Sequence, residues 1–172
     1  MCGIVGYVGF QDAASFLIDG LRKLEYRGYD SAGIACYENG KIEIRKKVGG
    51  IANLESYLEP HPIHGQIGIG HTRWATHGRP SDVNAHPHGD AENRFVVVHN
   101  GIIENFMELK RDLIAKGHVF VSETDTEVIA HLLADLHDGD FLSTVQKMLD
   151  VVDGSYSLAV MDRDEPDKLI CT

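Results

Sequence analysis

The order in which strand-like and helix-like runs follow one another is the feature that most constrains the fold of this chain. A strand-like run opens the sequence, one helical run and several strand-like runs follow, and further helical runs precede two closing strand-like runs. A doubly wound parallel sheet would instead alternate strands and helices throughout. The order therefore predicts an α+β fold with mixed layers and much antiparallel pairing.

Local signals place the elements of the first hundred residues. A helix is expected over residues 12–28, where apolar side chains recur at helical spacing and Asp12 suits the N-cap. Asn39-Gly40 lies between two β-rich runs, which predicts a hairpin. Single strands are expected at 2–10, 66–74 and 94–101, and the hairpin with its two strands is expected over 32–48.

Capping signals place the elements of the remaining residues. A helix is expected from Ile103 to Gly117, because glycine suits the position just after a helix. Thr124 and Glu127 have the spacing of a capping box at the start of the next helix. The other expected elements are helices at 127–137 and 141–152 and strands at 155–162 and 167–172.

Composition limits the classes of partner. Twenty-six acidic against sixteen basic residues give a net charge of −10, so a nucleic-acid partner is not expected. No apolar stretch approaches the length of a membrane span. The three cysteines lack a C-x-x-C spacing and the N-terminus lacks a signal peptide, which together predict a cytoplasmic protein with reduced thiols. Residues 1–172 are interpreted as one globular domain.

Cys2 stands directly behind the initiator methionine. If Met1 is removed, one residue carries both a nucleophilic sulfur and a free α-amine. That amine has a pKa of about 7.7–8.0, so it could act as the general base near neutral pH. The alternative is that Cys2 is a small residue filling a strand. Position alone leaves the two interpretations about even, and Gly3 together with the polar stretches of the chain favours the nucleophile.

Three polar, glycine-rich stretches hold further candidates. Arg73 lies between a strand and a loop, where it could bind a carboxylate with two parallel hydrogen bonds or simply face solvent. Asn100-Gly101 is on sequence alone better explained as a hairpin turn, although its amide and N–H could also stabilise an oxyanion. Asp125 could cap a helix or hold an α-ammonium group. The stretches are 70–88, 98–106 and 122–131.

Ten histidines raise the question of a metal site. The groups HPIH, HTRWATH and HPH match no zinc-binding spacing, so solvated or second-shell histidines are expected, with no metal and no cofactor. The thiol, the arginine, the Asn-Gly pair and the acid together outline a site for an amino acid that bears a carboxamide.

Six motifs in this chain resemble those of a known family. They are CGIVGY after Met1, LEYRGYDSAG (24–33), HTRWATHG (71–78), NAHPH (84–88), VVHNGIIEN (97–105) and SETDTEVIAH (122–131). In this order they resemble the N-terminal glutaminase domains of the glucosamine-6-phosphate synthases, which are class II glutamine amidotransferases. The resemblance covers nearly the whole chain. It implies the N-terminal-nucleophile hydrolase fold, a four-layer α/β/β/α sandwich of two mainly antiparallel sheets packed face to face.

The resemblance also implies roles for the candidate residues. Cys2 would attack the side-chain amide of glutamine and form a γ-glutamyl thioester with release of ammonia, and its α-amine would act as the base. Asn100 and Gly101 would form the oxyanion hole. Arg73 would bind the α-carboxylate of glutamine, and Asp125 would bind its α-ammonium group.

Four more residues acquire roles only from the resemblance. Thr76 and His77 would line the glutamine pocket, Trp74 would gate the passage that carries ammonia to a second site, and Arg27 would support the loop around the nucleophile.

The family domain continues beyond the equivalent of Thr172, and two sugar-isomerase domains that bind fructose 6-phosphate follow it. Residues 1–172 are therefore expected to be an incomplete glutaminase domain of a homo-oligomeric enzyme. Two alternatives remain open. One is the glutaminase domain of another class II enzyme, such as amidophosphoribosyltransferase, asparagine synthase or glutamate synthase. The other is an inactive domain that binds glutamine without turnover, which a retained Met1 would favour.

Overall fold

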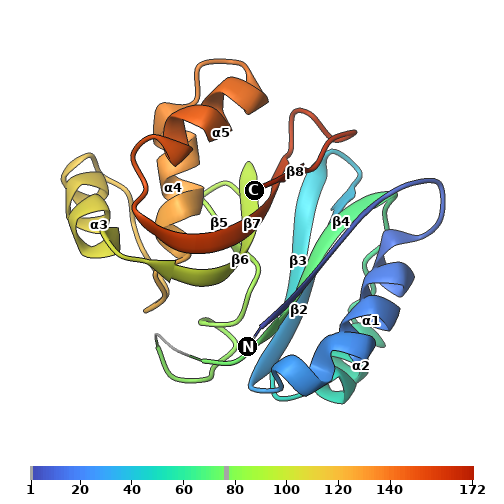
Figure 1. The fold of residues 1–172 in the computed structure, drawn as a ribbon. Coiled ribbons are helices and arrows are strands. Elements are labelled where there is room, and N and C mark those ends of the chain that lie inside the picture. The colour runs from blue at the N-terminus through green and yellow to red at the C-terminus, as the bar shows by residue number, and fades with distance from the viewer. Residues whose placement is uncertain (1, 76–77) are drawn as a thin grey trace.

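Two antiparallel sheets of four strands each form the centre of the computed structural model, which describes residues 2–75 and 78–172 (Figure 1). The first sheet has the strand order β1-β4-β2-β3 and the second has the order β5-β6-β7-β8. The strands of the first sheet are β1 Gly3–Val8, β2 Ser31–Glu38, β3 Lys41–Val48 and β4 Ile67–Arg73. Those of the second are β5 His88–Gly89, β6 Phe95–Ile103, β7 Gly154–Asp162 and β8 Ile170–Cys171.

Helices cover the outer face of each sheet, which gives four layers (Figure 1). Helices α1 (Ala13–Leu24) and α2 (Ile51–Leu58) pack on the first sheet. Helices α3 (Phe106–Ala115), α4 (Glu127–Leu136) and α5 (Phe141–Leu149) pack on the second. The predicted α+β fold and its α/β/β/α layering are therefore confirmed.

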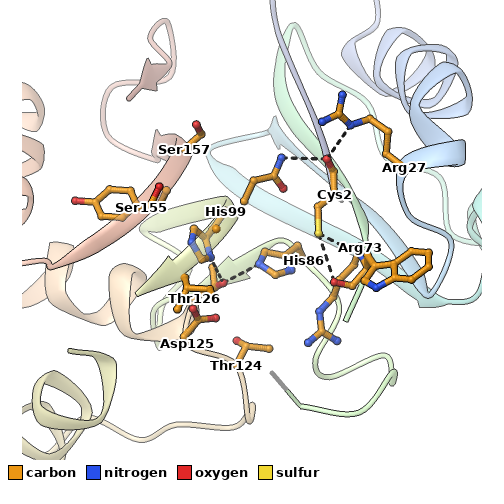
Figure 2. A pocket seen from close by; sticks show the side chains of 15 residues that line it. Cys2, Arg27, Arg73, His86, His99, Thr124, Asp125, Thr126, Ser155 and Ser157 are labelled. Carbon is orange, nitrogen blue, oxygen red and sulfur yellow. Dashed lines mark hydrogen bonds between the residues drawn. The ribbon is translucent and has the colours of Figure 1, made fainter. Parts of the chain in front are cut away.

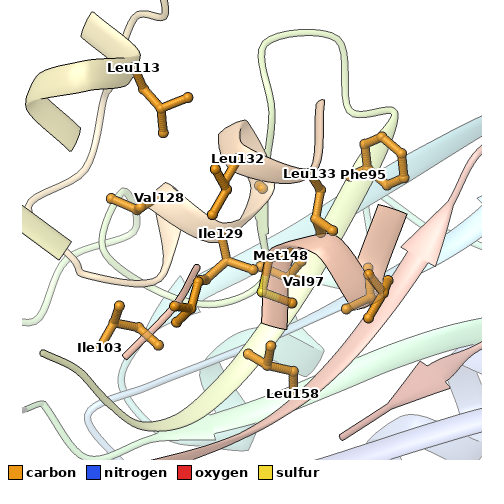
Figure 3. Close-up of a cluster of buried hydrophobic side chains, with 14 of the residues drawn as sticks. Phe95, Val97, Ile103, Leu113, Val128, Ile129, Leu132, Leu133, Met148 and Leu158 are labelled. Carbon is orange, nitrogen blue, oxygen red and sulfur yellow. The ribbon is translucent and has the colours of Figure 1, made fainter. Parts of the chain in front are cut away.

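The run FVVV at 95–98 shows why the sheets stack. Successive strand residues point to opposite faces. Val96 and Val98 accordingly join the core between the two sheets, while Phe95 and Val97 face the helices. Figure 3 shows that outer core, in which Val97 and Leu158 of the strands meet Ile129, Leu133 and Met148 of the helices. Because both faces are buried, the strand reads as an unbroken apolar run.

Several local predictions are confirmed. The Asp12 side chain caps α1 by accepting from the Ser15 backbone N–H at 3.2 Å. Asn39 and Gly40 form the predicted hairpin turn between β2 and β3, with positive φ at both residues. Gly117 follows α3 at φ +97°, where its N–H donates to the carbonyl of Ile114.

Other boundaries differ from the prediction. Helix α1 ends at Leu24, and a 3₁₀ turn over Glu25–Arg27 replaces its expected last turn. Helix α3 begins at Phe106 rather than at Ile103, because β6 continues to Ile103 and pairs there with Gly154 of β7. The closing strand β8 contains only Ile170–Cys171, since backbone hydrogen bonds among 162–168 form turns.

The capping box predicted for Thr124 and Glu127 is wrong. Glu127 accepts from the backbone N–H groups of Val121 and Ser122, and the Thr124 hydroxyl bonds Ser122 and His88. The carboxylate therefore holds the loop before α4 rather than the helix end. Burial by itself would raise the pKa of Glu127, but the hydrogen bonds of this carboxylate with His131, Val121 and Ser122 outweigh burial and lower the pKa to about 2.

Helix α2 was not among the expected elements, although Ile51, Leu54 and Leu58 have helical spacing and pack on the first sheet. In the part of the chain that the structure describes, no helix is long and apolar enough to cross a membrane.

Candidate active site

A cavity of about 510 Å³ opens at the N-terminus of the chain, between the two sheets (Figure 2). Segments far apart in the sequence line it: the start of β1, the end of β4, the end of β6, the residues before α4 and the start of β7. It brings together every described candidate from the sequence: Cys2, Arg27, Arg73, Trp74, Asn100, Gly101 and Asp125. Thr76 and His77, also predicted to line the pocket, lie outside the described residues, as does Met1.

Cys2 is half-buried, and four hydrogen bonds fix its position, one of which runs from Sγ to the Trp74 carbonyl oxygen at 3.6 Å. The Sγ atom accepts from the Trp74 backbone N–H at 3.2 Å. The Cys2 carbonyl accepts from Arg27 Nε at 3.3 Å and from Asn100 Nδ2 at 3.2 Å. The Arg27 contact fits the predicted supporting role.

Asn100 and Gly101 are strand residues, so the hairpin interpretation of this dipeptide is wrong. They pair with Ser157 and Tyr156 of β7. Gly101 has φ +127°, and a Cβ there would overlap the Ser155 carbonyl oxygen, so glycine is needed at this position. The Asn100 carboxamide is held at both ends, since Oδ1 lies 2.9 Å from His71 Nε2 while Nδ2 donates to Cys2.

Arg73 ends β4 and is only 3% exposed, so the interpretation of a surface arginine is wrong. Its Nη2 donates to the Gly78 carbonyl at 3.2 Å. Burial lowers the pKa of Arg73, against the opposing influence of Cys2, Asp30 and Asp125. The guanidinium remains a cation at neutral pH because its ordinary pKa lies above 12.

Asp125 lies two residues before α4 and is 5% exposed. Its Oδ2 accepts from the backbone N–H of Ile103 at 3.0 Å, so the carboxylate ties the end of β6 to the start of α4. Figure 2 shows Arg73 and Asp125 lining the same cavity. A buried cation and a buried carboxylate in one cavity suit the two charged groups of an α-amino acid.

Trp74 follows Arg73 and is 46% exposed, with its ring edge-on to Tyr29 at a centroid distance of 5.5 Å. The next residue is also anchored, because the Ala75 N–H donates to Asp30 Oδ2 at 2.7 Å. The indole therefore stands at the mouth of the cavity on a fixed backbone. Its predicted gating of ammonia stays a prediction.

Sequence reasoning missed four buried histidines at the cavity: His86 and His99 line it, and His71 and His88 lie behind it. His71 stacks on His86 with ring centroids 4.2 Å apart, and Figure 2 shows His86 and His99 converging on the Thr126 hydroxyl. Of the two alternatives expected for the histidines, solvated or second-shell, the solvated one is wrong for these four, because all of them are buried. The apolar residues around His71 and His99, in GIGHTR and FVVVH, are a signal that could have placed them in buried strands.

Within residues 2–75 and 78–172, no group of three or more histidine, cysteine or acidic side chains is placed to hold a metal ion. The four buried rings instead bond backbone, hydroxyl and amide groups.

A four-layer α/β/β/α sandwich whose first strand begins at residue 3, with the Cys2 thiol at the cavity between its sheets, defines the N-terminal-nucleophile hydrolase fold. The model of the glutamine amidotransferase domain family matches residues 71–172. The chain belongs to this family.

Close relatives carry the same domain. The chain is 56% identical to a glutamine–fructose-6-phosphate aminotransferase (isomerizing) of Clostridium acetobutylicum, over 99% of the chain and 28% of that protein. It is also 56% identical to the enzyme so named in Pyrococcus horikoshii, over 98% of the chain and 29% of that protein. The chain thus spans under a third of the length of these curated relatives, and corresponds to their N-terminal part.

Solved structures agree on the fold. Glutamine phosphoribosylpyrophosphate amidotransferase from B. subtilis has a TM-score of 0.82 and 28% identity, over 95% of this chain and 35% of that one. A glutamine aminotransferase class-II domain protein from Silicibacter pomeroyi has a TM-score of 0.63 at 16% identity, over 95% of this chain and 73% of that one, and supports the fold alone. Identity twice as high to the fructose-6-phosphate enzymes favours that member of the class over the phosphoribosyl alternative.

Proposed function

We propose that this domain hydrolyses glutamine to glutamate and ammonia through a γ-glutamyl thioester on Cys2. One observation carries the proposal: the thiol lies in one cavity with a buried cation, a buried carboxylate and the Asn100-Gly101 pair. The cation and carboxylate suit the α-carboxylate and α-ammonium of the substrate. The cavity then directs the side-chain carboxamide of glutamine toward the sulfur.

The chemistry follows from these positions. After removal of Met1, the Cys2 α-amine takes the thiol proton and Sγ forms a bond to the amide carbon. The resulting oxyanion receives hydrogen bonds from Asn100 Nδ2 and the Gly101 N–H. The C–N bond then breaks, and the proton held by the amine passes to the departing nitrogen, so ammonia leaves. Water adds to the thioester with the amine again as base, which releases glutamate and restores the thiol.

The whole protein's activity extends this proposal. In a longer chain like those of its relatives, the ammonia would pass the Trp74 gate and aminate fructose 6-phosphate bound to another domain, yielding glucosamine 6-phosphate. The support is the identity of 52–56% to enzymes named for that reaction. A homo-oligomeric full-length enzyme and a cytoplasmic location stay predictions.

The direct test uses the purified protein with glutamine, after intact-mass measurement of its N-terminus. We expect protein without Met1 to release glutamate and ammonia in equal amounts, and an acid-quenched sample to carry a glutamyl group on its N-terminal peptide. A glutamine-binding protein without product or adduct, although Met1 is absent, would refute the proposal and favour the inactive alternative.

Arg73→Lys should raise the KM for glutamine about tenfold or more while kcat changes by less than about threefold. Lysine keeps the charge but loses the planar fork that binds a carboxylate through two hydrogen bonds. Steady-state kinetics of glutamate release measures both constants. Arg79→Lys, at an exposed position of the same loop, is the matched control and should change neither. An unchanged KM in Arg73→Lys would remove Arg73 from the binding site.

Asn100→Ala should lower kcat by about 100- to 1000-fold, because losing one oxyanion donor typically costs about 2.7–4 kcal/mol. The KM should change little, since the donor acts on charge that develops during the reaction. Asn53→Ala, on the exposed side of α2, is the control. A variant with a raised KM and normal kcat would mean that Asn100 binds substrate in its ground state only.

A further inference from the structure

His71 is fully buried on β4, behind the cavity. Its Nε2 lies 2.9 Å from Asn100 Oδ1 and 3.0 Å from the His99 carbonyl oxygen. Both partners are acceptors, and a neutral imidazole carries a single N–H. The ring proton is therefore on Nε2, and His71 donates to the Asn100 carboxamide.

This donation decides which way the Asn100 amide faces. In the observed orientation, Oδ1 accepts from His71 and Nδ2 donates to the Cys2 carbonyl. The flipped amide would set its NH₂ against the His71 N–H and its oxygen against the Cys2 carbonyl. Both contacts would then place like groups against each other. The His71 N–H would keep the His99 carbonyl and the Cys2 carbonyl would keep Arg27, but the two hydrogen bonds that the Asn100 amide makes would be lost.

The surrounding groups keep the His71 ring neutral and in place. The ring stacks on His86, whose Nε2 lies 2.8 Å from the Thr126 hydroxyl. Burial lowers the pKa of His71 to about 3, opposed by its hydrogen bonds to Asn100 and the His99 backbone and assisted by His99 and Arg73. The ring therefore stays uncharged near neutral pH.

We propose that His71 is a positioning residue for the oxyanion hole: its Nε2–H fixes the Asn100 carboxamide with the NH₂ group toward the reacting centre. The proposal rests on the proposed function, because it assigns His71 a part in stabilising the oxyanion of glutamine hydrolysis. His71 touches Asn100 and does not line the cavity. It acts on the reaction through Asn100 alone.

His71→Phe keeps a flat ring for the stack on His86 and removes the N–H. We expect kcat to fall about tenfold with the KM for glutamine changed less than twofold. The decisive measurement is a double-mutant cycle with Asn100→Ala. In the Asn100→Ala background, His71→Phe should change kcat by less than twofold, because no donor is left to orient. An equal fall in both backgrounds would show a structural role only and overturn the proposal.

A second pair of variants covers the case in which phenylalanine does not fold. His71→Gln and His71→Met have nearly equal side-chain length, but only glutamine brings an N–H donor. Glutamine should retain a kcat at least about fivefold above methionine, and equal values would overturn the proposal. A wild-type chain lacking Met1 that fails to hydrolyse glutamine would overturn the proposed function and this role together. An active wild type with an additive cycle would overturn the role of His71 alone.

Discussion

Cys2→Ala should lower glutamate release by at least about 1000-fold while glutamine still binds. The sulfur forms the bond to the substrate, and removing a nucleophile abolishes the covalent route that it provides. Glutamine binding should persist because the charged groups that suit its α-carboxylate and α-ammonium, on Arg73 and Asp125, remain in the cavity. Calorimetry measures the binding, and an enzymatic glutamate assay measures the turnover.

Cys36→Ala is the matched control. Cys36 is fully buried on β2, where burial, with smaller effects from Asp12 and Glu38, raises the pKa of its thiol to about 12. A buried thiol that does not ionise is unreactive, so this variant should keep its kcat within about twofold. Glutamate release near the wild-type rate in Cys2→Ala would contradict the assignment of the nucleophile.

Lowering the pH from 7 to 5 should reduce the free energy of unfolding by about 6 kcal/mol. Burial lowers the pKa of His71 to about 3 and those of His86 and His88 well below the ordinary range. Below pH 6.5 the unfolded chain protonates these three rings while the folded chain does not. Each ring then lowers the stability by about 1.4 kcal/mol per pH unit.

The charged groups near these three rings shift the pKa values of the rings in both directions. Arg73 lowers the pKa of all three rings and Lys46 lowers that of His88, whereas Glu127 raises that of His88. Carboxylates whose pKa is lowered in the folded chain, such as Glu127, also reduce the free energy of unfolding, but only at a pH more acidic than this range. Since domains are typically stable by about 5–15 kcal/mol, we expect unfolding to begin near pH 5.

Denaturant titrations at pH 7, 6 and 5 measure this dependence. His61→Ala removes an exposed histidine that is not one of these three, and it should leave the pH dependence of the unfolding free energy unchanged. An unfolding free energy that is equal at pH 7 and pH 5 would show that the three rings are not buried in neutral form.

The sequence by itself determined features that depend on residues close together in the chain. The Asp12 cap, the Asn39-Gly40 hairpin turn and the glycine after α3 were predicted and are confirmed. Each involves contacts within a few residues, so local side-chain chemistry and backbone freedom decide it. The motifs that contain the candidate site residues could also be recognised in the sequence, because residue type alone indicates the chemistry.

Only the tertiary structure decided what the local signals left open. Asn100-Gly101 has the signature of a turn, yet it lies in β6 because β7, more than 50 residues later, pairs with it. Glu127 has the spacing of a capping box, yet it binds the loop that precedes its helix. His71, His86, His88 and His99 are buried because the two sheets and the residues just before α4 enclose them and supply their hydrogen bonds. In each case partners distant in the sequence set the free energy of the observed arrangement, so a local pattern could not determine it.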